Sequence, residues 1–235
     1  MSKDLVELGK KNAAIKAVEE NIKKDMIVGI GSGSTIVYAA KRLGEINKEK
    51  SLNIKCIPSS FQAYQLIIQN NLKLVSLEQY PILDIDIDGA DEVDKNLDLI
   101  KGGGGCLVQE KIIASNSKKV IIIVDFRKKS DILGTNWKRG IPIEVIPMAY
   151  FPIMEKLKKL GGTPILRMAQ SKSGPLISDN GNFIIDVDFG GLSNPSELNM
   201  KLLNITGVVD TGLFIGITSK VYVGLEDGNV LTLTK

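Results

Sequence analysis

The chain has 235 residues, of which 43% are hydrophobic, and its 30 basic and 27 acidic side chains give a formal net charge of +3. This size and composition predict a soluble globular protein with one large core or two unequal cores. The nearly balanced charge argues against nucleic acid as a partner. The chain contains no histidine, which excludes Ser-His-Asp and Cys-His catalysis and most zinc sites.

Targeting and membrane signals are missing from the sequence. The first residues, MSKDLVELGKK, lack the apolar core of a signal peptide, and no run approaches the length of a membrane span. The two cysteines, Cys56 and Cys106, lack C-x-x-C spacing and are expected to be reduced and partly buried. We therefore expect a cytoplasmic protein with no membrane partner.

Helices and strands alternate in the first part of the chain. Apolar residues recur at helical spacing from Asp4 to Lys23, and Met26 to Ile30 is typical of a buried strand. The pattern then predicts, in order, a helix over 34–43, a strand over 53–57, a helix over 61–69, strands over 72–75 and 83–87, a helix over 106–115 and a strand over 119–124. This alternation predicts an α/β domain with a largely parallel sheet covered on both faces.

The pattern changes after Leu133. Prolines recur in the segments that follow. Their pattern predicts a strand at IPIEVIP, a helix over 148–160, strands over 164–168 and 182–188, and a helix that begins at Ser193-Asn-Pro195. Paired strands over 221–225 and 230–234 close the larger domain. We expect a larger domain of residues 1–133 and 211–235, with a smaller α+β domain, residues 134–210, inserted into it.

A polyglycine turn precedes one predicted helix, in the sequence KGGGGCLVQEK from Lys101 to Lys111. Four glycines let the backbone take positive φ angles and approach a ligand closely. The N–H groups and the positive dipole end of the helix would face that ligand. Glu110 lies about one turn along the helix and can lean toward this anion cradle. Seen alone, Lys101 and Glu110 are also compatible with surface charges, and the glycines with a linker.

A second glycine-rich turn, GIGSGST from Gly29 to Thr35, also follows a strand and begins a helix. Such a turn can hold a phosphate or carboxylate with its N–H groups and hydroxyls. The spacing fits neither a dinucleotide fingerprint nor a Walker loop. Small-anion binding is favoured over a simple tight turn.

The most acidic stretch, DIDIDGADEVD from Asp84 to Asp94, resembles the first half of a calcium loop. The position that should supply a bidentate glutamate is Lys95, which argues against calcium. We expect the strand to end near Asp88 and to leave Asp88 and Asp91 at the carboxyl edge of the sheet, where open α/β sheets bind ligands. A solvated acidic turn is the alternative. The basic groups Lys10-Lys11 and Arg127-Lys-Lys129 are as compatible with a solvated surface as with a binding role.

Eight segments now identify a family: GIGSGST, IPSSFQAYQLI, DIDGADEVD, IKGGGGCLVQEKIIA, VDFRKKSDILG, IPIEVIPMA, SDNGNFIID and GVVDTGLF. In this order they closely resemble the type A ribose-5-phosphate isomerases, from about Lys11 to Phe214. The resemblance implies a Rossmann-like domain with an inserted ferredoxin-like α+β domain, in a homodimer or homotetramer without metal or cofactor. It also implies that the substrate is a sugar phosphate, because this family interconverts ribose 5-phosphate and ribulose 5-phosphate in the non-oxidative pentose phosphate pathway.

Carried over by position, the resemblance makes Glu110 the general base, with Asp88, Asp91 and Lys101 as further catalytic residues. The substrate-binding residues it implies are Ser32, Gly33, Ser34, Thr35, Asp88, Gly89, Ala90, Asp91, Lys101, Gly102, Gly103, Gly104 and Lys128, with Lys11 as a further phosphate-side lysine. Ser32 stands where many members have threonine, and Gly105-Cys106 where many have two alanines. Ser32 keeps the hydroxyl, so neither departure argues against activity.

Two other functions remain to be weighed. A non-catalytic sugar-phosphate sensor of the same fold would normally carry a DNA-binding module ahead of it, and only about 25 residues precede the first predicted strand. Glu110 and both aspartates also argue against a sensor. A calcium-binding module is disfavoured by Lys95.

Overall fold

The structure, a computed structural model, describes residues 3–235 and divides into two compact units. Met1 and Ser2, with which the predicted larger domain begins, lie outside the described residues. Unit 1 contains the chain up to Ala90 together with Gln109–Lys129 and Gly216–Lys235. Unit 2 contains Asp91–Val108 and Ser130–Ile215.

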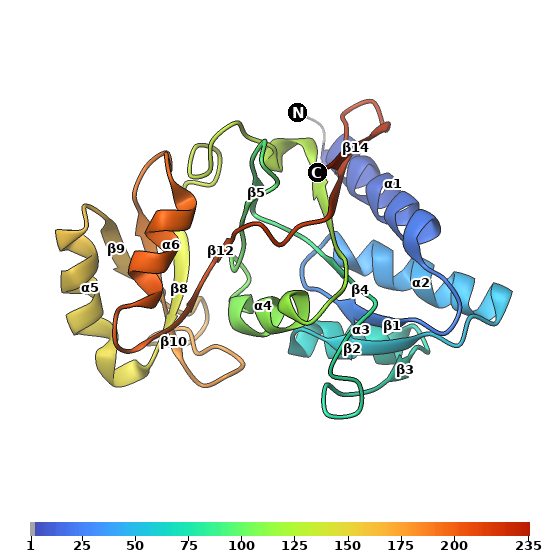
Figure 1. Cartoon of the computed structure of the whole chain (residues 1–235), viewed down its shortest axis with the longest axis horizontal. Helices are drawn as coiled ribbons and strands as arrows, with labels where there is room; N and C mark the ends of the chain where they lie inside the picture. Colours follow the sequence, from blue (N-terminus) through green and yellow to red (C-terminus); the bar gives the residue numbers. More distant parts are fainter. Residues whose placement is uncertain (1–2) are drawn as a thin grey trace. The chain divides into compact units, whose positions relative to one another are not determined.

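Unit 1 is built on a seven-stranded sheet (Figure 1) in the order β14-β13-β7-β4-β1-β2-β3. Its strands are β1 (Ile27–Ile30), β2 (Lys55–Pro58), β3 (Lys73–Leu74), β4 (Ile85–Asp88), β7 (Val120–Asp125), β13 (Lys220–Gly224) and β14 (Val230–Thr234). Every neighbouring pair is parallel except the β13–β14 pair. The largely parallel sheet and the closing pair of strands predicted from the sequence are both confirmed.

Helices cover both faces of this sheet. They are α1 (Lys3–Asn21), α2 (Ile36–Lys50), α3 (Phe61–Gln69) and α4 (Leu107–Ser115), with a short 3-10 helix η1 (Phe126–Lys128). Helices α1 to α3 pack on one face, where Val28 and Ile85 are fully buried. On the other face Ile113 of α4 packs with Ile27 and Ile57.

Helix α2 is longer than predicted, because it continues through Gly44 to Lys50. Gly44 serves close packing rather than helix termination, since a Cβ there would lie 2.7 Å from the Asn70 carbonyl oxygen. Arg42 stabilises the helix surface through ion pairs with Glu19 at 2.8 Å and Glu45 at 3.1 Å.

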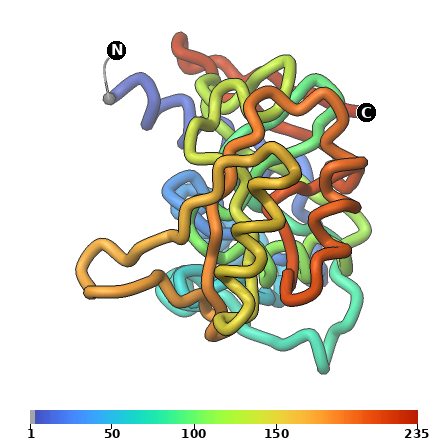
Figure 2. The backbone as a smooth tube through the Cα atoms, turned by 90° about the vertical axis from the view of Figure 1, so that its left-hand side faces the viewer, coloured from blue at the N-terminus to red at the C-terminus, as the bar shows by residue number. Residues whose placement is uncertain are grey.

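Unit 2 contains a four-stranded antiparallel sheet in the order β11-β8-β10-β9. The elements are β8 (Ile141–Val145), η2 (Pro147–Ala149), α5 (Tyr150–Lys159), β9 (Thr163–Leu166), β10 (Phe183–Asp188), α6 (Pro195–Leu203) and β11 (Val208–Thr211). A βαββαβ chain in this order is ferredoxin-like. Figure 2 shows the segment between β9 and β10 running out as a long loop. Two isolated β-bridges stabilise this segment, one between Met168 and Pro175 and one between Ile177 and Phe183.

A small third sheet also lies in unit 2, in the order β12-β6-β5. Its strands are β5 (Glu92–Val93), β6 (Leu99–Ile100) and β12 (Leu213–Phe214). Residues 91–108, 130–133 and 211–215 were expected in the larger domain, whereas they cluster with unit 2. The reason is strand pairing between β6 and β12, whose residues Ile100 and Leu213 share the core of this unit.

Across residues 3–235, no helix combines the length and the apolar composition that crossing a membrane requires.

Candidate active site

The serine loop of unit 1, Gly31–Thr35, links the end of β1 to the start of α2. Asp88 ends the neighbouring parallel strand β4, and its Oδ1 accepts hydrogen bonds from the N–H groups of Ser32 at 3.0 Å and Gly89 at 2.7 Å. A Cβ on Gly31 would fall 1.9 Å from the same oxygen. The glycine is therefore required for the buried Asp88 carboxylate to lie beside the loop, at the predicted edge of the sheet.

Three polar side chains from two other segments support the serine loop. Ser32 Oγ donates to Ser60 Oγ at 2.7 Å, the N–H of Gly33 donates to Gln62 Oε1 at 2.8 Å, and Ser34 Oγ accepts from Lys10 Nζ at 3.1 Å. Thr35 precedes α2, and its hydroxyl makes no capping bond. A half-exposed hydroxyl cluster at the N-terminus of a 15-residue helix suits an anion.

The structure distinguishes the two adjacent lysines of α1. Lys10 reaches Ser34 and also pairs with Glu7 at 2.8 Å. Lys11, which the resemblance favoured, is exposed. The pattern alone left Lys10 and Lys11 equally compatible with solvated surface, and only the family resemblance singled out Lys11.

In the basic segment after β7, a buried carboxylate binds Arg127. Asp125 Oδ1 accepts from the N–H of Arg127 at 3.2 Å and from its Nε at 2.7 Å. Burial raises the pKa of Asp125. The hydrogen bonds and the positive charge of Arg127, with the charge of Lys128, together lower it by more, so that this pKa lies below its ordinary value. Lys128, in η1, is half-buried.

Glu110 lies in unit 1, in the first turn of α4, and is only 5% exposed. The predicted helix is confirmed, with its start at Leu107. A carboxylate so far removed from water is chemically unlike an ordinary surface glutamate, because few solvent molecules compete for its oxygens.

The tetraglycine loop of unit 2, Gly102–Gly105, has a strongly constrained backbone. Gly102 and Gly105 have φ angles of 95° and 89°, which favour glycine. The N–H of Gly103 donates to Asp91 Oδ2 at 2.6 Å, and a Cβ on Gly103 would lie 2.7 Å from Asp91 Oδ1. At Gly104, in contrast, a Cβ would meet nothing within 4 Å. The loop is closely packed on one side and open at Gly104.

Lys101 is buried beside this loop, with 3% of its surface exposed. Its Nζ lies 5.4 Å from the centroid of the Phe214 ring, and its N–H donates to the Gly212 carbonyl at 2.8 Å. The cation is thus buried beside an aromatic ring, where its charge acts more strongly than it would in water.

Two residues that the sequence analysis missed hold the tetraglycine loop. Arg167 Nη1 donates to the carbonyls of Gly102 at 2.8 Å and Gly103 at 3.2 Å. Its Nε donates to Asp186 Oδ2 at 2.8 Å, and its Nη2 pairs with Asp186 Oδ1. Only the tertiary structure could reveal these contacts, since neither residue stands near the glycines in sequence.

A third missed residue, Glu92, is fully buried next to Asp91. Its carboxylate accepts from the N–H groups of Gly134 at 2.9 Å, Asn136 at 2.9 Å and Trp137 at 3.1 Å. Burial raises the pKa of Glu92, but these hydrogen bonds lower it by more, so that the pKa lies below its ordinary value. Within residues 3–235 no group of three or more Asp, Glu or Cys side chains is arranged to hold a metal ion.

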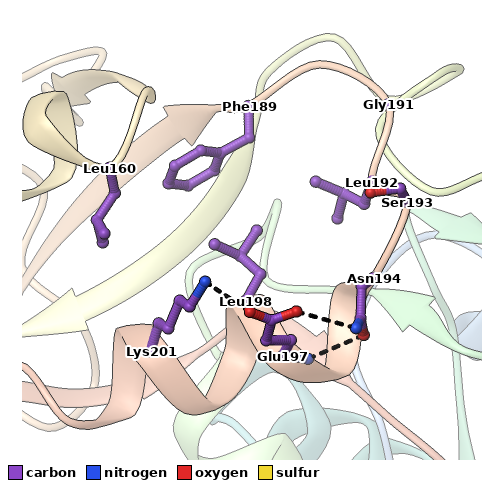
Figure 3. Close-up of a pocket in the computed structure, with 9 residues that line it drawn as sticks. All are labelled: Leu160, Phe189, Gly191, Leu192, Ser193, Asn194, Glu197, Leu198 and Lys201. Carbon is purple, nitrogen blue, oxygen red and sulfur yellow. Dashed lines mark hydrogen bonds and ion pairs between the residues drawn. The ribbon is translucent and has the colours of Figure 1, made fainter.

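Unit 2 contains a pocket of about 250 Å³, and Figure 3 shows the side chains that line it. It is lined by Leu160, Phe189, Gly191, Leu192, Ser193, Asn194, Glu197, Leu198 and Lys201. None of the predicted site residues lines it. Its polar groups are engaged with one another, because Glu197 binds Lys201 at 2.7 Å and Asn194 at 3.1 Å. We assign no site there.

The predicted residues therefore form two groups, one in each unit. In unit 1 the structure brings Ser32 to Asp88, and in unit 2 it brings Asp91 to Gly103. The unit 1 group offers hydroxyls and a helix N-terminus to an anion, and the buried Glu110 is available as a base. The unit 2 group offers a cation and backbone donors to a developing negative charge.

Comparison with known proteins agrees with this chemistry. A family model described as ribose 5-phosphate isomerase A (phosphoriboisomerase A) matches residues 55–228. The chain is 54% identical over 225 residues to a ribose-5-phosphate isomerase of Sus scrofa, covering 95% of this chain and 74% of that protein. It is 50% identical over 236 residues to one of Candida albicans, covering 98% of each.

Solved structures give the same result over the full length. The ribose 5-phosphate isomerase A of Methanocaldococcus jannaschii superposes with a TM-score of 0.91 at 41% identity, covering 100% of both chains. A D-ribose-5-phosphate isomerase in complex with phospho-erythronic acid superposes with a TM-score of 0.94 at 42% identity, again over 100% of both chains. From its sequence and its fold alike, this chain belongs to the ribose 5-phosphate isomerase A family.

Proposed function

We propose that this protein interconverts D-ribose 5-phosphate and D-ribulose 5-phosphate through an enediolate intermediate. The observation that carries the proposal is the buried carboxylate of Glu110 in a family member that contains no histidine. The relatives named above are ribose-5-phosphate isomerases, and one of them binds a four-carbon acid phosphate, which supports the choice of substrate.

Glu110 is the proposed proton carrier. Moving the carbonyl from C1 to C2 requires a base that takes the proton from C2 and returns it to C1, while the hydroxyl protons redistribute between the two oxygens. A single carboxylate can do both, because it is protonated in the enediolate state and free again at the end. No redox partner is needed, since the substrate and the product are isomers.

Lys101 and the tetraglycine loop are the proposed stabilisers of the enediolate oxygens. The buried ammonium group and the backbone of Gly102 to Gly104, with the Gly104 N–H as the donor to the oxygen, lower the energy of the charge that develops during proton abstraction. Removing one donor of this kind typically costs about 2.7–4 kcal/mol in the transition state.

Asp88 and Asp91 are proposed to bind sugar hydroxyls. One of them, or Lys101, also transfers the proton that opens the furanose ring. Gly89 and Ala90, which separate the two aspartates in sequence, contribute backbone groups to the same contacts.

The phosphate is assigned to the serine loop and the nearby lysines. Ser32, Gly33, Ser34 and Thr35 offer hydroxyls and N–H groups at the start of α2, and Lys128 adds a charge. Lys10 joins this set because it contacts Ser34, and Lys11 remains a further phosphate-side candidate. Binding energy from this remote group holds C1 and C2 in place for the chemistry.

We also propose a cytoplasmic location and a homodimeric or homotetrameric state. Both cysteines are thiols, as is usual in a reducing compartment. Large apolar side chains such as Phe61 (65% exposed) and Ile165 (64% exposed) are suited to subunit contacts. Sedimentation that finds only monomers at micromolar concentration would exclude the oligomer.

The function is tested by incubating chelator-treated protein with ribose 5-phosphate in heavy water and following the reaction by NMR. We expect ribulose 5-phosphate to form without added metal, with deuterium at C1, because the carboxylate exchanges its proton with solvent. A hydride shift would leave C1 without deuterium. If no ribulose 5-phosphate forms, the proposal is wrong.

A further inference from the structure

Arg167 is the buried cation of unit 2 that the proposed chemistry does not use. It follows β9 directly and is only 6% exposed. Its backbone is fixed on both sides, because its N–H donates to the Ile184 carbonyl at 2.8 Å and its carbonyl accepts from the Leu176 N–H at 2.9 Å. Asp186, on the adjacent strand β10, fixes the guanidinium through two oxygens. Such a paired arginine is rigid in all its parts.

The remaining nitrogen of this guanidinium faces the tetraglycine loop. Nη1 donates to the carbonyls of Gly102 and Gly103, at 2.8 and 3.2 Å. A peptide unit is planar and trans, so its C=O and the following N–H point in opposite directions. Holding these two carbonyls therefore turns the N–H groups of Gly103 and Gly104 away from Arg167.

The two N–H groups then have different uses. That of Gly103 donates to Asp91 Oδ2 at 2.6 Å. That of Gly104 makes no hydrogen bond to another residue within 3–235, and the space around this glycine is open. The Gly104 N–H is thus an oriented donor that a ligand can use.

We propose that Arg167, oriented by Asp186, is a positioning residue that fixes the Gly104 N–H as a donor to the enediolate oxygen. This inference rests on the proposed function for the identity of the acceptor, but the orientation of the loop is a property of unit 2 alone. Arginine is required because the fork of its guanidinium serves Asp186 and two carbonyls at once, whereas lysine offers a single nitrogen.

The test compares Arg167→Lys and Arg167→Met with the wild type. Lysine retains a positive charge beside Asp186, which keeps the variant folded. The control is Lys158→Met, which removes a cation of the same unit that is paired with Glu155 on the surface. We expect kcat to fall about tenfold or more in Arg167→Lys and about 10²-fold in Arg167→Met, the size found for loss of one oxyanion donor, with KM nearly unchanged.

Two binding measurements separate positioning from general damage. Inorganic phosphate should inhibit wild type and Arg167→Lys equally, because it uses the serine loop. Phospho-erythronic acid, whose carboxylate resembles the enediolate oxygens, should bind the variant more weakly, by about the same factor as kcat. Equal loss of affinity for both probes, or wild-type kcat in Arg167→Lys, would overturn the proposal.

Amide hydrogen exchange keeps this test independent of the proposed function. We expect the amide of Gly103, which is bonded to Asp91, to exchange faster in Arg167→Lys than in the wild type, with β8 and β10 unchanged. An unchanged loop overturns the positioning role whether or not the protein is an isomerase. An inactive wild type with a loosened variant loop overturns the proposed function instead.

Discussion

At the scale of single residues, the candidate site depends on glycines placed where a side chain would collide with an aspartate carboxylate. Gly31 permits Asp88 to approach the serine loop, and Gly103 permits Asp91 to approach the tetraglycine loop. In both places an aspartate oxygen accepts a backbone N–H of the loop. A carboxylate and the backbone that binds it are therefore fixed together before a ligand arrives.

Gly31→Ala should consequently lower both stability and activity. The added methyl would push the Asp88 carboxylate from its bonds to Ser32 and Gly89, and overpacking of this kind costs about 1–3 kcal/mol. Urea unfolding and KM for ribose 5-phosphate measure the two effects. Gly104→Ala is the matched control for stability, because its methyl has free space, and it should unfold at the wild-type urea concentration or above it. Equal unfolding curves for wild type and Gly31→Ala would refute the packing argument.

At the scale of elements, loops are tied to neighbouring segments by buried polar groups. Ser60 is the N-cap of α3, where its Oγ accepts the Ala63 N–H at 3.0 Å and also the Ser32 hydroxyl. Glu92 holds residues 134–137 through their N–H groups. Ser60 thus joins the serine loop to α3, and Glu92 joins β5 to a loop about 40 residues later in the chain.

Ser60→Ala should remove both bonds of this hydroxyl. Loss of an N-cap costs about 1 kcal/mol, and the freed Ser32 side chain should raise KM more than it changes kcat. Ser60→Thr, which retains a hydroxyl, is the control and should recover most of both losses. Thermal unfolding and steady-state kinetics provide the readout. An unaltered KM in the alanine variant would show that Ser60 does not support the serine loop for substrate binding.

Glu92→Gln should lower stability in a pH-dependent way. The folded-state pKa of Glu92 is lowered, so its carboxylate contributes stability that is fully present above the unfolded-state pKa of about 4.3. That contribution is lost as pH falls through the folded-state pKa. The variant should be less stable by about 1–3 kcal/mol at neutral pH, and the difference should shrink below about pH 4.

Urea denaturation of both proteins between neutral and acidic pH measures this difference. The surface variant Glu155→Gln should show no comparable gap, because its partner Lys158 is itself exposed. A difference between wild type and Glu92→Gln that stays constant down to the lowest pH would contradict the assigned ionisation.

At the scale of the whole molecule, sequence patterns predict one unit better than the other. Strands such as β1 and β7 are buried apolar runs between helices, so their type and their order along the chain could be predicted. Strands β5, β6 and β12 have two residues each and form no period that a sequence can display. The grouping of residues 91–108 with unit 2 follows from the pairing of these short strands, which the sequence pattern does not indicate.

The same contrast holds for the candidate site. Ser32, Asp88, Asp91 and Glu110 lie in motifs whose residue types and spacing indicate their chemistry. Asp186 lies in strand β10 and Arg167 directly follows β9, and their role is visible only from contacts between segments far apart in sequence. Sequence thus indicates the groups proposed to touch a substrate better than the groups that hold them.

The central claim is that Glu110 carries the proton, and the turnover of Glu110→Gln with ribose 5-phosphate tests it most directly. Glutamine keeps the size of the side chain but cannot accept the proton, so kcat should fall by about 10²- to 10⁴-fold while phospho-erythronic acid still binds. Glu155→Gln, a surface change, should retain wild-type kcat. Wild-type turnover by Glu110→Gln would contradict the account.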